Sequence, residues 1–496
     1  MIDELIALPL NAHRGNKKGK KMHRDLKTKL LIFIMALSVS VLSDYPVLFC
    51  QTKSDTSIAG TWQGILETGG AKLHIAFHVG KSHDGLFKAT LDSPDQSAYG
   101  IPFASVTVEG DSAHFVGASF GGTYDGKFSA TRSIIVGIWK QGGGAVDLKM
   151  ERSATPLAPP KIERPQEPKP PYPYKSDEVS FESELTGLRY SGTLTFSDSI
   201  GPFPAVVLIT GSGVNDRNEA VFGHKPFLVI ADYLTRRGIA VLRVDDRGVS
   251  GSTGEKAEAT LLDRAQDVIA EIGFLKTCQG IDSDRIGLIG HSEGGMIAPI
   301  VAAKSPNVAF VVLLAGPGVP GYQVIMDQVA LLAKTAGMND SLVAIALKIQ
   351  KRVLDIAMTG QDSVKAADSL RAIFGPENAR SAARTNGKIS RLLSPSYRSF
   401  LSYDPRPSLE KVKCPLLAID GTLDLQVPPE KNLRAIEDAL KEGGNKDYTI
   451  KLIPGLNHLF QDAKTGSLSE YAQIEETFSP EALKIIGDWI VEKTRK

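Results

Sequence analysis

A serine, an aspartate and a histidine occur in that order, each just after a segment that reads as an apolar strand. Ser292 lies in GHSEG, residues 290–294, directly after the apolar run RIGLIG. Asp424 follows the run PLLAID, and His458 follows the run YTIKLIP. A serine hydroxyl is a poor nucleophile until an imidazole removes its proton, and a buried carboxylate holds that imidazole in the required tautomer. The pattern predicts attack by Ser292, with His458 as general base and Asp424 as the acid that orients it.

The segment around Ser292 has the form Gly-x-Ser-x-Gly, made by Gly290, His291, Ser292, Glu293 and Gly294. Between a strand and a helix, this form predicts a sharp turn that lifts the serine hydroxyl above the sheet. Larger side chains at the two glycines would collide with the neighbouring strand and helix. An ordinary tight turn is the alternative, which the preceding strand disfavours.

Asp420 competes with Asp424 for the role of the acid, since it also ends a strand. A residue directly at a strand end faces the turn, so we expect Asp420 to cap Gly421 or Thr422. The acid is therefore assigned to Asp424. His224 is the one distant histidine that competes with His458, and we expect it to begin a helix.

Attack on a carbonyl creates a negatively charged oxygen that needs two backbone N–H donors. One is expected from Glu293, the residue after the nucleophile, and one from the turn TGSG at 210–213. The glycines of this turn let the backbone approach a substrate closely, and we favour the N–H of Ser212 or of Gly213. A turn without catalytic duty is the alternative.

The elements that must position these residues read as an α/β domain over 176–496. Apolar strands alternate with amphipathic helices, which predicts a mostly parallel sheet with helices on both faces. Helical sequence interrupts the pattern at about 317–409, and we expect a cap inserted there. The cap either covers the mouth of the site and sets acyl size, or is plain helical packing. Charged residues at 215–219 and 245–247 are expected to hold loops together by ion pairs rather than to act chemically.

The residues before this domain differ from it in composition. Residues 58–152 contain seven short alternating segments separated by Gly, Asp and Ser clusters, which predicts a small all-β barrel or sandwich. Residues 153–175 are rich in proline, which fixes φ and removes backbone donors. We expect this segment to be an extended, semi-rigid linker.

The first 50 residues read as a leader. The apolar run at 30–42 follows basic residues and has the length of an export signal rather than of a spanning helix. Met22 as the true start would give a conventional leader, with cleavage after Ser43. A lipidated Cys50 is the alternative, which the bulky Phe49 disfavours. We expect a periplasmic or extracellular protein without a membrane span in its mature form.

The charge balance is near neutral, with 57 Lys and Arg against 56 Asp and Glu. It gives no reason to expect a nucleic-acid partner, so a small molecule is the expected substrate. The three cysteines lack the spacing of a zinc site, and we expect no metal and no cofactor. A disulfide between Cys278 and Cys414, and assembly into a homo-oligomer, stay open.

Five motifs together resemble the α/β-hydrolase superfamily, in the expected order over roughly 180–496. They are the GSG turn at 211–213, DDRGVSGSTG at 245–254, GHSEGG at 290–295, DGTLD at 420–424 and GLNH at 455–458. GSGVNDR at 211–217 and DSPDQ at 92–96 are similar to stretches of bacterial two-domain carboxylesterases with an N-terminal β-domain. The resemblance implies the α/β-hydrolase fold and cofactor-free hydrolysis of short-chain esters through an acyl-enzyme. Val214, where similar proteins often have proline, is a local departure.

Two other functions occur with the same residues or on the same fold. A serine peptidase of the prolyl-oligopeptidase type uses the same three residues on the same fold, but residues 58–152 are too few for a propeller. The chain also shows no glutamate motif for binding a free amino terminus. A catalytically inactive binding module is disfavoured because serine, aspartate and histidine are all present.

Overall fold

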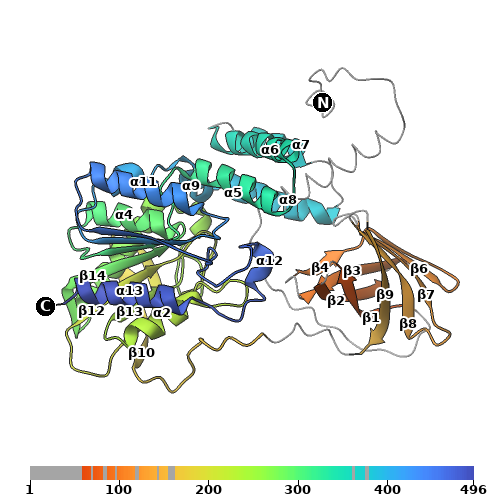
Figure 1. Ribbon diagram of the computed structural model, residues 1–496, viewed down its shortest axis with the longest axis horizontal. Coiled ribbons are helices and arrows are strands. Elements are labelled where there is room, and N and C mark those ends of the chain that lie inside the picture. The colour runs from red at the N-terminus through yellow and green to blue at the C-terminus, as the bar shows by residue number, and fades with distance from the viewer. Residues whose placement is uncertain are drawn as a thin grey trace.

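The computed structural model describes residues 58–495 except 69–70, 82–85, 95–97, 118–121, 142–143, 155–161, 360–362 and 375–378. The predicted export signal, Met22, Ser43 and Cys50 lie outside the described residues. Two sheets organise the chain, one of nine strands and one of eight (Figure 1). No helix in the described part of the chain has the length and hydropathy needed to span a membrane.

The first sheet is antiparallel, with strand order β4-β3-β2-β1-β9-β8-β7-β6-β5. Its strands are β1 (Gly60–Thr68), β2 (Ala71–Lys81), β3 (Phe87–Ser93), β4 (Ala98–Pro102), β5 (Ser105–Glu109), β6 (Ser112–Gly117), β7 (Gly122–Phe128), β8 (Ile134–Gln141) and β9 (Gly144–Ser153).

The two ends of this sheet are joined by a bent segment between β4 and β5. The N–H of Phe103 donates to Ala89 in β3 at 2.9 Å, and the N–H of Ala104 donates to Val116 in β6 at 2.6 Å. The sheet therefore closes as an up-and-down barrel, which decides between the predicted barrel and sandwich.

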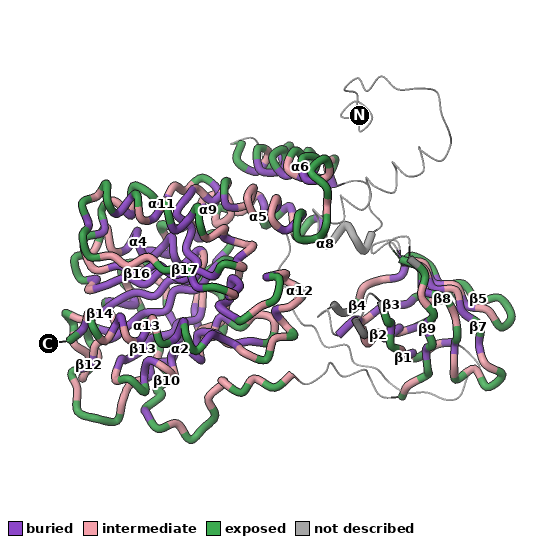
Figure 2. The backbone as a smooth tube through the Cα atoms, viewed as in Figure 1, coloured by how far each residue is buried: buried purple, intermediate pink, exposed green. Residues whose placement is uncertain are grey.

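Side chains fill the interior of the barrel. Buried and more exposed positions alternate along the strands (Figure 2), and the interior core includes Trp62, Phe77, Phe115 and Tyr124. The expectation of seven strands was wrong, since β1 and β4 were not counted. Both contain glycine, and β4 ends in Pro102, so their sequences resemble turns although the barrel gives them strand partners.

The proline-rich linker is more than a spacer. From residue 162 onward it contacts the second domain through several side chains. Glu167 pairs with Lys225 at 3.0 Å, and Tyr174 donates to Asp232 at 2.9 Å. Arg164 donates to four backbone carbonyls, those of Phe222, Gly223, Ala472 and Ile474. Gln166 bonds the backbone of Thr477 and Phe478. This part of the linker is anchored because its polar side chains find unpaired backbone groups, which the proline content could not indicate.

The second sheet has strand order β10-β11-β13-β12-β14-β15-β16-β17. Its strands are β10 (Lys175–Ser183), β11 (Leu188–Phe196), β12 (Phe203–Ile209), β13 (Ala240–Val244), β14 (Ile281–His291), β15 (Val311–Leu314), β16 (Leu416–Gly421) and β17 (Tyr448–Ile453). From β13 to β17 all neighbours run parallel, and the two strands at the other edge are antiparallel.

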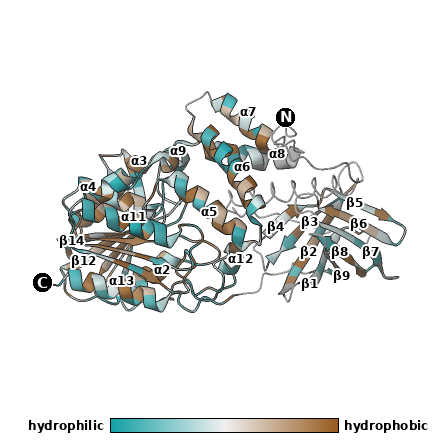
Figure 3. Cartoon of the chain, turned by 45° about the horizontal axis from the view of Figure 1, so that its top comes forward, coloured by the Kyte–Doolittle hydropathy of each residue, from teal (hydrophilic) through white to brown (hydrophobic). Residues whose placement is uncertain are grey.

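Helices cover both faces of this sheet. The helices α3 (Leu261–Thr277), α4 (Gly294–Lys304) and α11 (Pro429–Glu442) pack on one face. The helices α2 (Pro226–Thr235) and α13 (Pro480–Lys493) pack on the other. Figure 3 shows the strands between them as the most hydrophobic part of the domain. The predicted parallel sheet with two helical layers is confirmed.

The predicted cap is present between β15 and β16. It consists of α5 (Gly321–Thr335), α6 (Asp340–Met358), α7 (Ser363–Phe374), α8 (Ala379–Leu393), α9 (Pro395–Ser402) and α10 (Arg406–Leu409). Leu354 and Ala357 of α6 and Phe400 and Leu401 of α9 join the main hydrophobic core. The helices α6, α7 and α8 also share a small core of their own. The cap is thus tied to the sheet domain through α6 as well as through its C-terminal helices.

Candidate active site

The predicted site residues lie at one edge of the second sheet. The strands β12, β14, β16 and β17 run in the same direction, so their carboxyl ends meet there. Ser292 follows β14, Asp424 and His458 lie in the loops after β16 and β17, and the turn at 210–213 follows β12.

Ser292 sits in a strained turn. Its φ is +52°, a left-handed conformation that costs energy in any residue other than glycine. The turn is held because the N–H of Ser292 donates to Leu314 at 2.9 Å and its carbonyl accepts from Gly295 at 2.8 Å. A Cβ on Gly290 would lie 2.2 Å from the carbonyl oxygen of Gly294, and a Cβ on Gly294 would lie 2.2 Å from that of Ile209. The two glycines are therefore required by close backbone packing.

Asp424 and His458 form a buried hydrogen-bonded pair. His458 Nδ1 and Asp424 Oδ2 are 2.6 Å apart. The other oxygen, Oδ1, accepts the N–H groups of Gln426 at 2.7 Å and Val427 at 2.8 Å. Because Nδ1 donates to the carboxylate, Nε2 of neutral His458 keeps its lone pair, which is the state that a general base needs.

Asp420 does not contact His458. Its Oδ1 accepts the N–H of Gly421 at 2.7 Å, as expected, and its Oδ2 has no partner among the described residues. Burial, and then the neighbouring carboxylate of Asp424, raise the pKa of Asp420 well above its usual range. Burial and the neighbouring carboxylate therefore favour the protonated form of Asp420.

His291 lies against the ring of His458, with ring centroids 4.9 Å apart. Its Nε2 is 3.1 Å from the carbonyl oxygen of His458, and its Nδ1 is 3.0 Å from Glu219 Oε1. Burial lowers the pKa of His291, but Glu219 and the His458 carbonyl outweigh it and raise the pKa above its usual value. Both ring nitrogens face acceptors, so His291 satisfies them as an imidazolium. The contact with Glu219 could not be predicted from the sequence, because it joins residues 72 positions apart.

The turn at 210–213 lies beside the nucleophile, since a Cβ on Gly211 would be 3.3 Å from Ser292 Cβ. The N–H of Gly211 donates to Glu219 Oε1 at 2.6 Å. In the part of the chain that the structure describes, the N–H groups of Ser212, Gly213 and Glu293 have no acceptor. The three predicted oxyanion donors thus remain available to a ligand.

Comparison with known proteins identifies the family of this domain. Residues 206–465 match the model of the Alpha/beta hydrolase family. The chain belongs to this family.

The chain is 28% identical over 291 residues to the esterase EstD of Thermotoga maritima. This match covers 58% of the chain and 61% of that esterase. An uncharacterized 31.7 kDa protein of Escherichia coli is 27% identical over 224 residues, which cover 44% of the chain and 73% of that protein. A solved esterase of Pyrococcus furiosus matches at 17% identity with a TM-score of 0.40, covering 64% of the chain and 91% of that structure.

Ion pairs surround the site of this hydrolase, as the sequence predicted for the charged loops. Arg217 binds Asp245, with Nη2 and Oδ2 2.6 Å apart. Arg247 and Asp267 pair at 2.7 Å. Asp246 accepts from Lys256 and Arg264, which lie in different elements. The acidic partners were visible in the sequence, but which cation each would meet was not.

His224 belongs to the hydrolase scaffold rather than to the reacting group. It is buried two residues before α2, with Nε2 2.8 Å from the Tyr471 carbonyl and Nδ1 3.0 Å from Thr477 Oγ1. Burial lowers the pKa of His224 to about 4. Cys278 and Cys414 are free thiols. Within the described residues, no three His, Cys, Asp or Glu side chains gather in a way that could hold a metal.

Proposed function

We propose that this hydrolase is a serine carboxylesterase that cleaves short-chain esters through an acyl-enzyme. The observation that carries the proposal is the buried Asp424–His458 pair, whose hydrogen bond at Nδ1 leaves Nε2 free as a base. Ser292 at φ +52° on the turn after β14 supplies the nucleophile at the same sheet edge. The similarity to EstD, which is named an esterase, supports ester rather than peptide substrates.

The reaction begins when Ser292 Oγ attacks the ester carbonyl and its proton passes to His458 Nε2. The N–H of Glu293 and an N–H of the turn at 210–213 stabilise the oxyanion. Collapse of this intermediate breaks the bond to the alcohol, which leaves with the proton from His458. Water then attacks the acyl carbonyl while His458 takes a proton from it. The bond between the acyl group and Ser292 Oγ breaks, the acid leaves, and His458 passes the proton from water to Ser292 Oγ.

The cap sets the substrate class in this proposal. Its helix α9 packs against η2 (Lys256–Glu258) and α3, close to the loops that carry the site. A helical insert in this position would limit the length of the acyl chain that can lie beside Ser292. The periplasmic or extracellular location stays a prediction.

The test is hydrolysis of p-nitrophenyl esters, acetate to decanoate, by the purified full-length protein. A fluorophosphonate should label Ser292, as read by peptide mass spectrometry. Ser292→Ala should lose both turnover and label. Ser305→Ala, at the far end of α4, is the matched control and should keep both.

An aminoacyl-arylamide panel measured beside the esters separates the alternatives. Turnover of arylamides alone would assign the site to a peptidase. No turnover and no label at Ser292 would contradict an active serine hydrolase and favour a binding module.

A further inference from the structure

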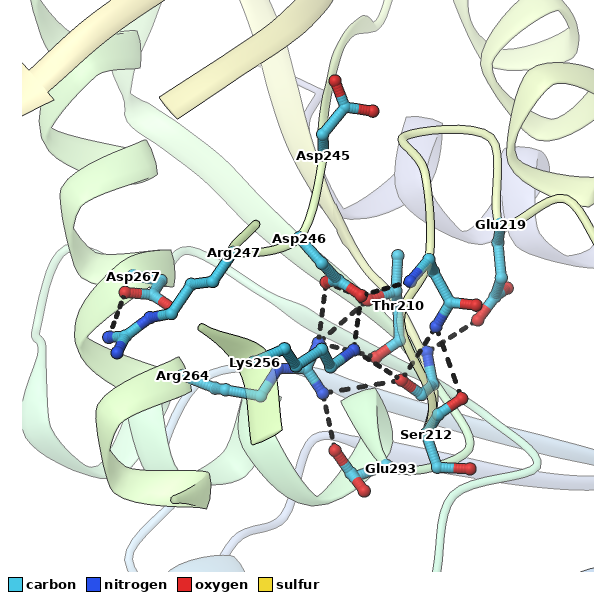
Figure 4. A network of polar contacts seen from close by, with 12 residues as sticks. Thr210, Ser212, Glu219, Asp245, Asp246, Arg247, Lys256, Arg264, Asp267 and Glu293 are labelled. Carbon is cyan, nitrogen blue, oxygen red and sulfur yellow. Dashed lines mark hydrogen bonds and ion pairs between the residues drawn. The ribbon is translucent and has the colours of Figure 1, made fainter. Parts of the chain in front are cut away.

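Two buried cations lie behind the turn that borders the nucleophile. Lys256 belongs to η2, and Arg264 lies in the first turn of α3, which Thr260 starts by a capping box with Asp263. Lys256 Nζ donates to the carbonyl oxygen of Gly211 at 3.3 Å, and Arg264 Nη1 donates to the same oxygen at 3.5 Å. Figure 4 shows both side chains converging on this turn.

A third donor reaches the same oxygen. Asn215 Nδ2 lies 3.2 Å from the carbonyl oxygen of Gly211. A carbonyl oxygen has two lone pairs and can accept two strong hydrogen bonds. The Gly211 oxygen has three donors, two of them cationic, which is more than it needs to satisfy its lone pairs. The environment of this one peptide group is therefore unusually cationic for a backbone turn.

The Gly211 carbonyl and the Ser212 N–H belong to one planar peptide group. In a trans peptide group these two bonds point in opposite directions, so donors on the oxygen fix the direction of the N–H. They also polarise it, because hydrogen bonds in a chain strengthen one another. The preceding N–H, of Gly211, is held by Glu219 at 2.6 Å and is not available to a substrate. Ser212 is thus the first residue of the turn whose N–H faces away from the cations and is free.

Arg264 also reaches the chain segment that carries the other donor. Its Nη1 is 2.6 Å from Glu293 Oε1, and its Nη2 is 2.8 Å from Thr210 Oγ1 and 3.2 Å from the Thr210 carbonyl. One guanidinium therefore joins the turn after β12 to the turn after β14. These two turns must keep a constant spacing if both N–H groups are to bind a single oxygen.

The cluster is electrically balanced. Asp246 and Glu293 supply two negative charges against Lys256 and Arg264, and all four side chains are buried. Burying four charges is expensive, and a neutral hydrogen-bonded turn could be built without them. Stability alone gives no reason for placing the two cations against one carbonyl oxygen.

We propose that Lys256 and Arg264 are positioning residues that act through the Gly211 carbonyl to aim and polarise the Ser212 N–H as the second oxyanion donor. This inference rests on the proposed esterase function and selects Ser212 over Gly213. It assigns to the buried charges a role in the rate of reaction, in addition to holding the loops.

The test uses the full-length protein and the double variant Lys256→Met/Asp246→Asn, which removes the cation together with a carboxylate that Arg264 also contacts. Lys256→Gln, which leaves the contact between Asp246 and Arg264 in place, is measured beside it. The double variant Arg247→Met/Asp267→Asn is the matched control, because this pair lies on the same loop and on α3 but does not contact Gly211. The readouts are kcat for a p-nitrophenyl ester and the inhibition constants of a trifluoromethyl ketone and of the matching secondary alcohol. The ketone adduct carries an oxyanion, and the alcohol does not.

The cations strengthen the hydrogen bond from the Ser212 N–H to the oxyanion by only a fraction of that bond's energy. Removing a whole oxyanion donor lowers kcat by roughly 100-fold, so we expect this change to lower kcat by about 10-fold. The Lys256→Met/Asp246→Asn variant should lose this factor in kcat and in ketone affinity, with alcohol affinity unchanged. Lys256→Arg, which keeps the cation, should retain activity to within about 3-fold. If the double variant does not fold, Lys256→Gln leaves Asp246 paired with Arg264 and serves in its place.

Unchanged ketone affinity, or an equal loss in the Arg247→Met/Asp267→Asn control, would refute the inference while leaving the esterase intact. Absence of ester turnover and of Ser292 labelling in the unsubstituted protein would instead refute the proposed function, and the inference with it.

Discussion

The substitution Asp424→Asn should remove most of the turnover and leave the fold intact. Asp424 Oδ1 accepts the N–H groups of Gln426 and Val427, and an asparagine oxygen can accept the same two. Its NH₂ group would then face His458 Nδ1, which must become the acceptor. The ring proton of neutral His458 would move to Nε2, where it prevents proton removal from Ser292. We expect kcat to fall on the order of 10³- to 10⁴-fold.

Asp420→Asn is the matched comparison, because Asp420 lies four residues away and is equally buried. Burial and the Asp424 carboxylate raise the pKa of Asp420 and so favour its neutral form, which an asparagine amide matches in charge and size. We expect kcat to stay within about 3-fold of the unsubstituted protein.

The same pair predicts a difference in stability with pH. A carboxyl whose native pKa is raised binds a proton in the folded state while the unfolded chain is already ionised. The free energy of unfolding therefore falls by about 1.4 kcal/mol per pH unit as the pH rises from the unfolded pKa to the native pKa. Asp420→Asn removes this loss, so the variant should be more stable than the unsubstituted protein at neutral pH.

The assay is p-nitrophenyl ester hydrolysis by both variants, with urea unfolding at pH 5 and pH 7. Circular dichroism checks that Asp424→Asn is folded. A larger loss of turnover in Asp420→Asn than in Asp424→Asn would overturn the assignment of the acid.

Three further substitutions test the scaffold. Gly294→Ala should lower the free energy of unfolding by about 3 kcal/mol, measured by thermal denaturation, because the new Cβ would lie 2.2 Å from the Ile209 carbonyl oxygen. His224 has a native pKa of about 4 against 6.5, so the unfolded chain binds more protons between these pH values and stability falls as the pH drops. His224→Gln should abolish that loss, up to about 3 kcal/mol, in urea unfolding at pH 7 and pH 4. Arg164→Ala should cost about 2 kcal/mol in urea unfolding, since four backbone carbonyls lose their donor, and an unchanged midpoint would mean that the linker is not anchored.

Local patterns indicate the parallel strands and several helices of the second domain, but not the antiparallel edge strands β10 and β11. The helices α3 and α13 each begin directly after a capping side chain, Thr260 and Ser479. Their apolar periodicity and caps lie within the segment itself, so no distant contact is needed to define them. In the barrel, local patterns do not indicate β1 and β4, because both contain glycine and β4 ends in proline. These residues are tolerated in a strand only when neighbouring strands supply the hydrogen bonds, which the local sequence does not show.

The sequence by itself determined which residues stand at the ends of parallel strands. Ser292, Asp424 and His458 could be chosen because each follows an apolar strand, and the carboxyl ends of such strands meet at one edge. It also indicated that the charged residues after β12 and β13 would form ion pairs.

Only the tertiary structure decided the partners of these residues. Glu219 meets His291, Arg264 meets Glu293, and Arg164 meets the loop at 472–474, across separations of 72, 29 and 308 or more residues. A buried charge takes as its partner the opposite charge that packing brings within reach, and that choice depends on the placement of whole helices and strands. The candidate catalytic residues were therefore readable in the chain, while the contacts that orient them arise only when the sheet edge is assembled.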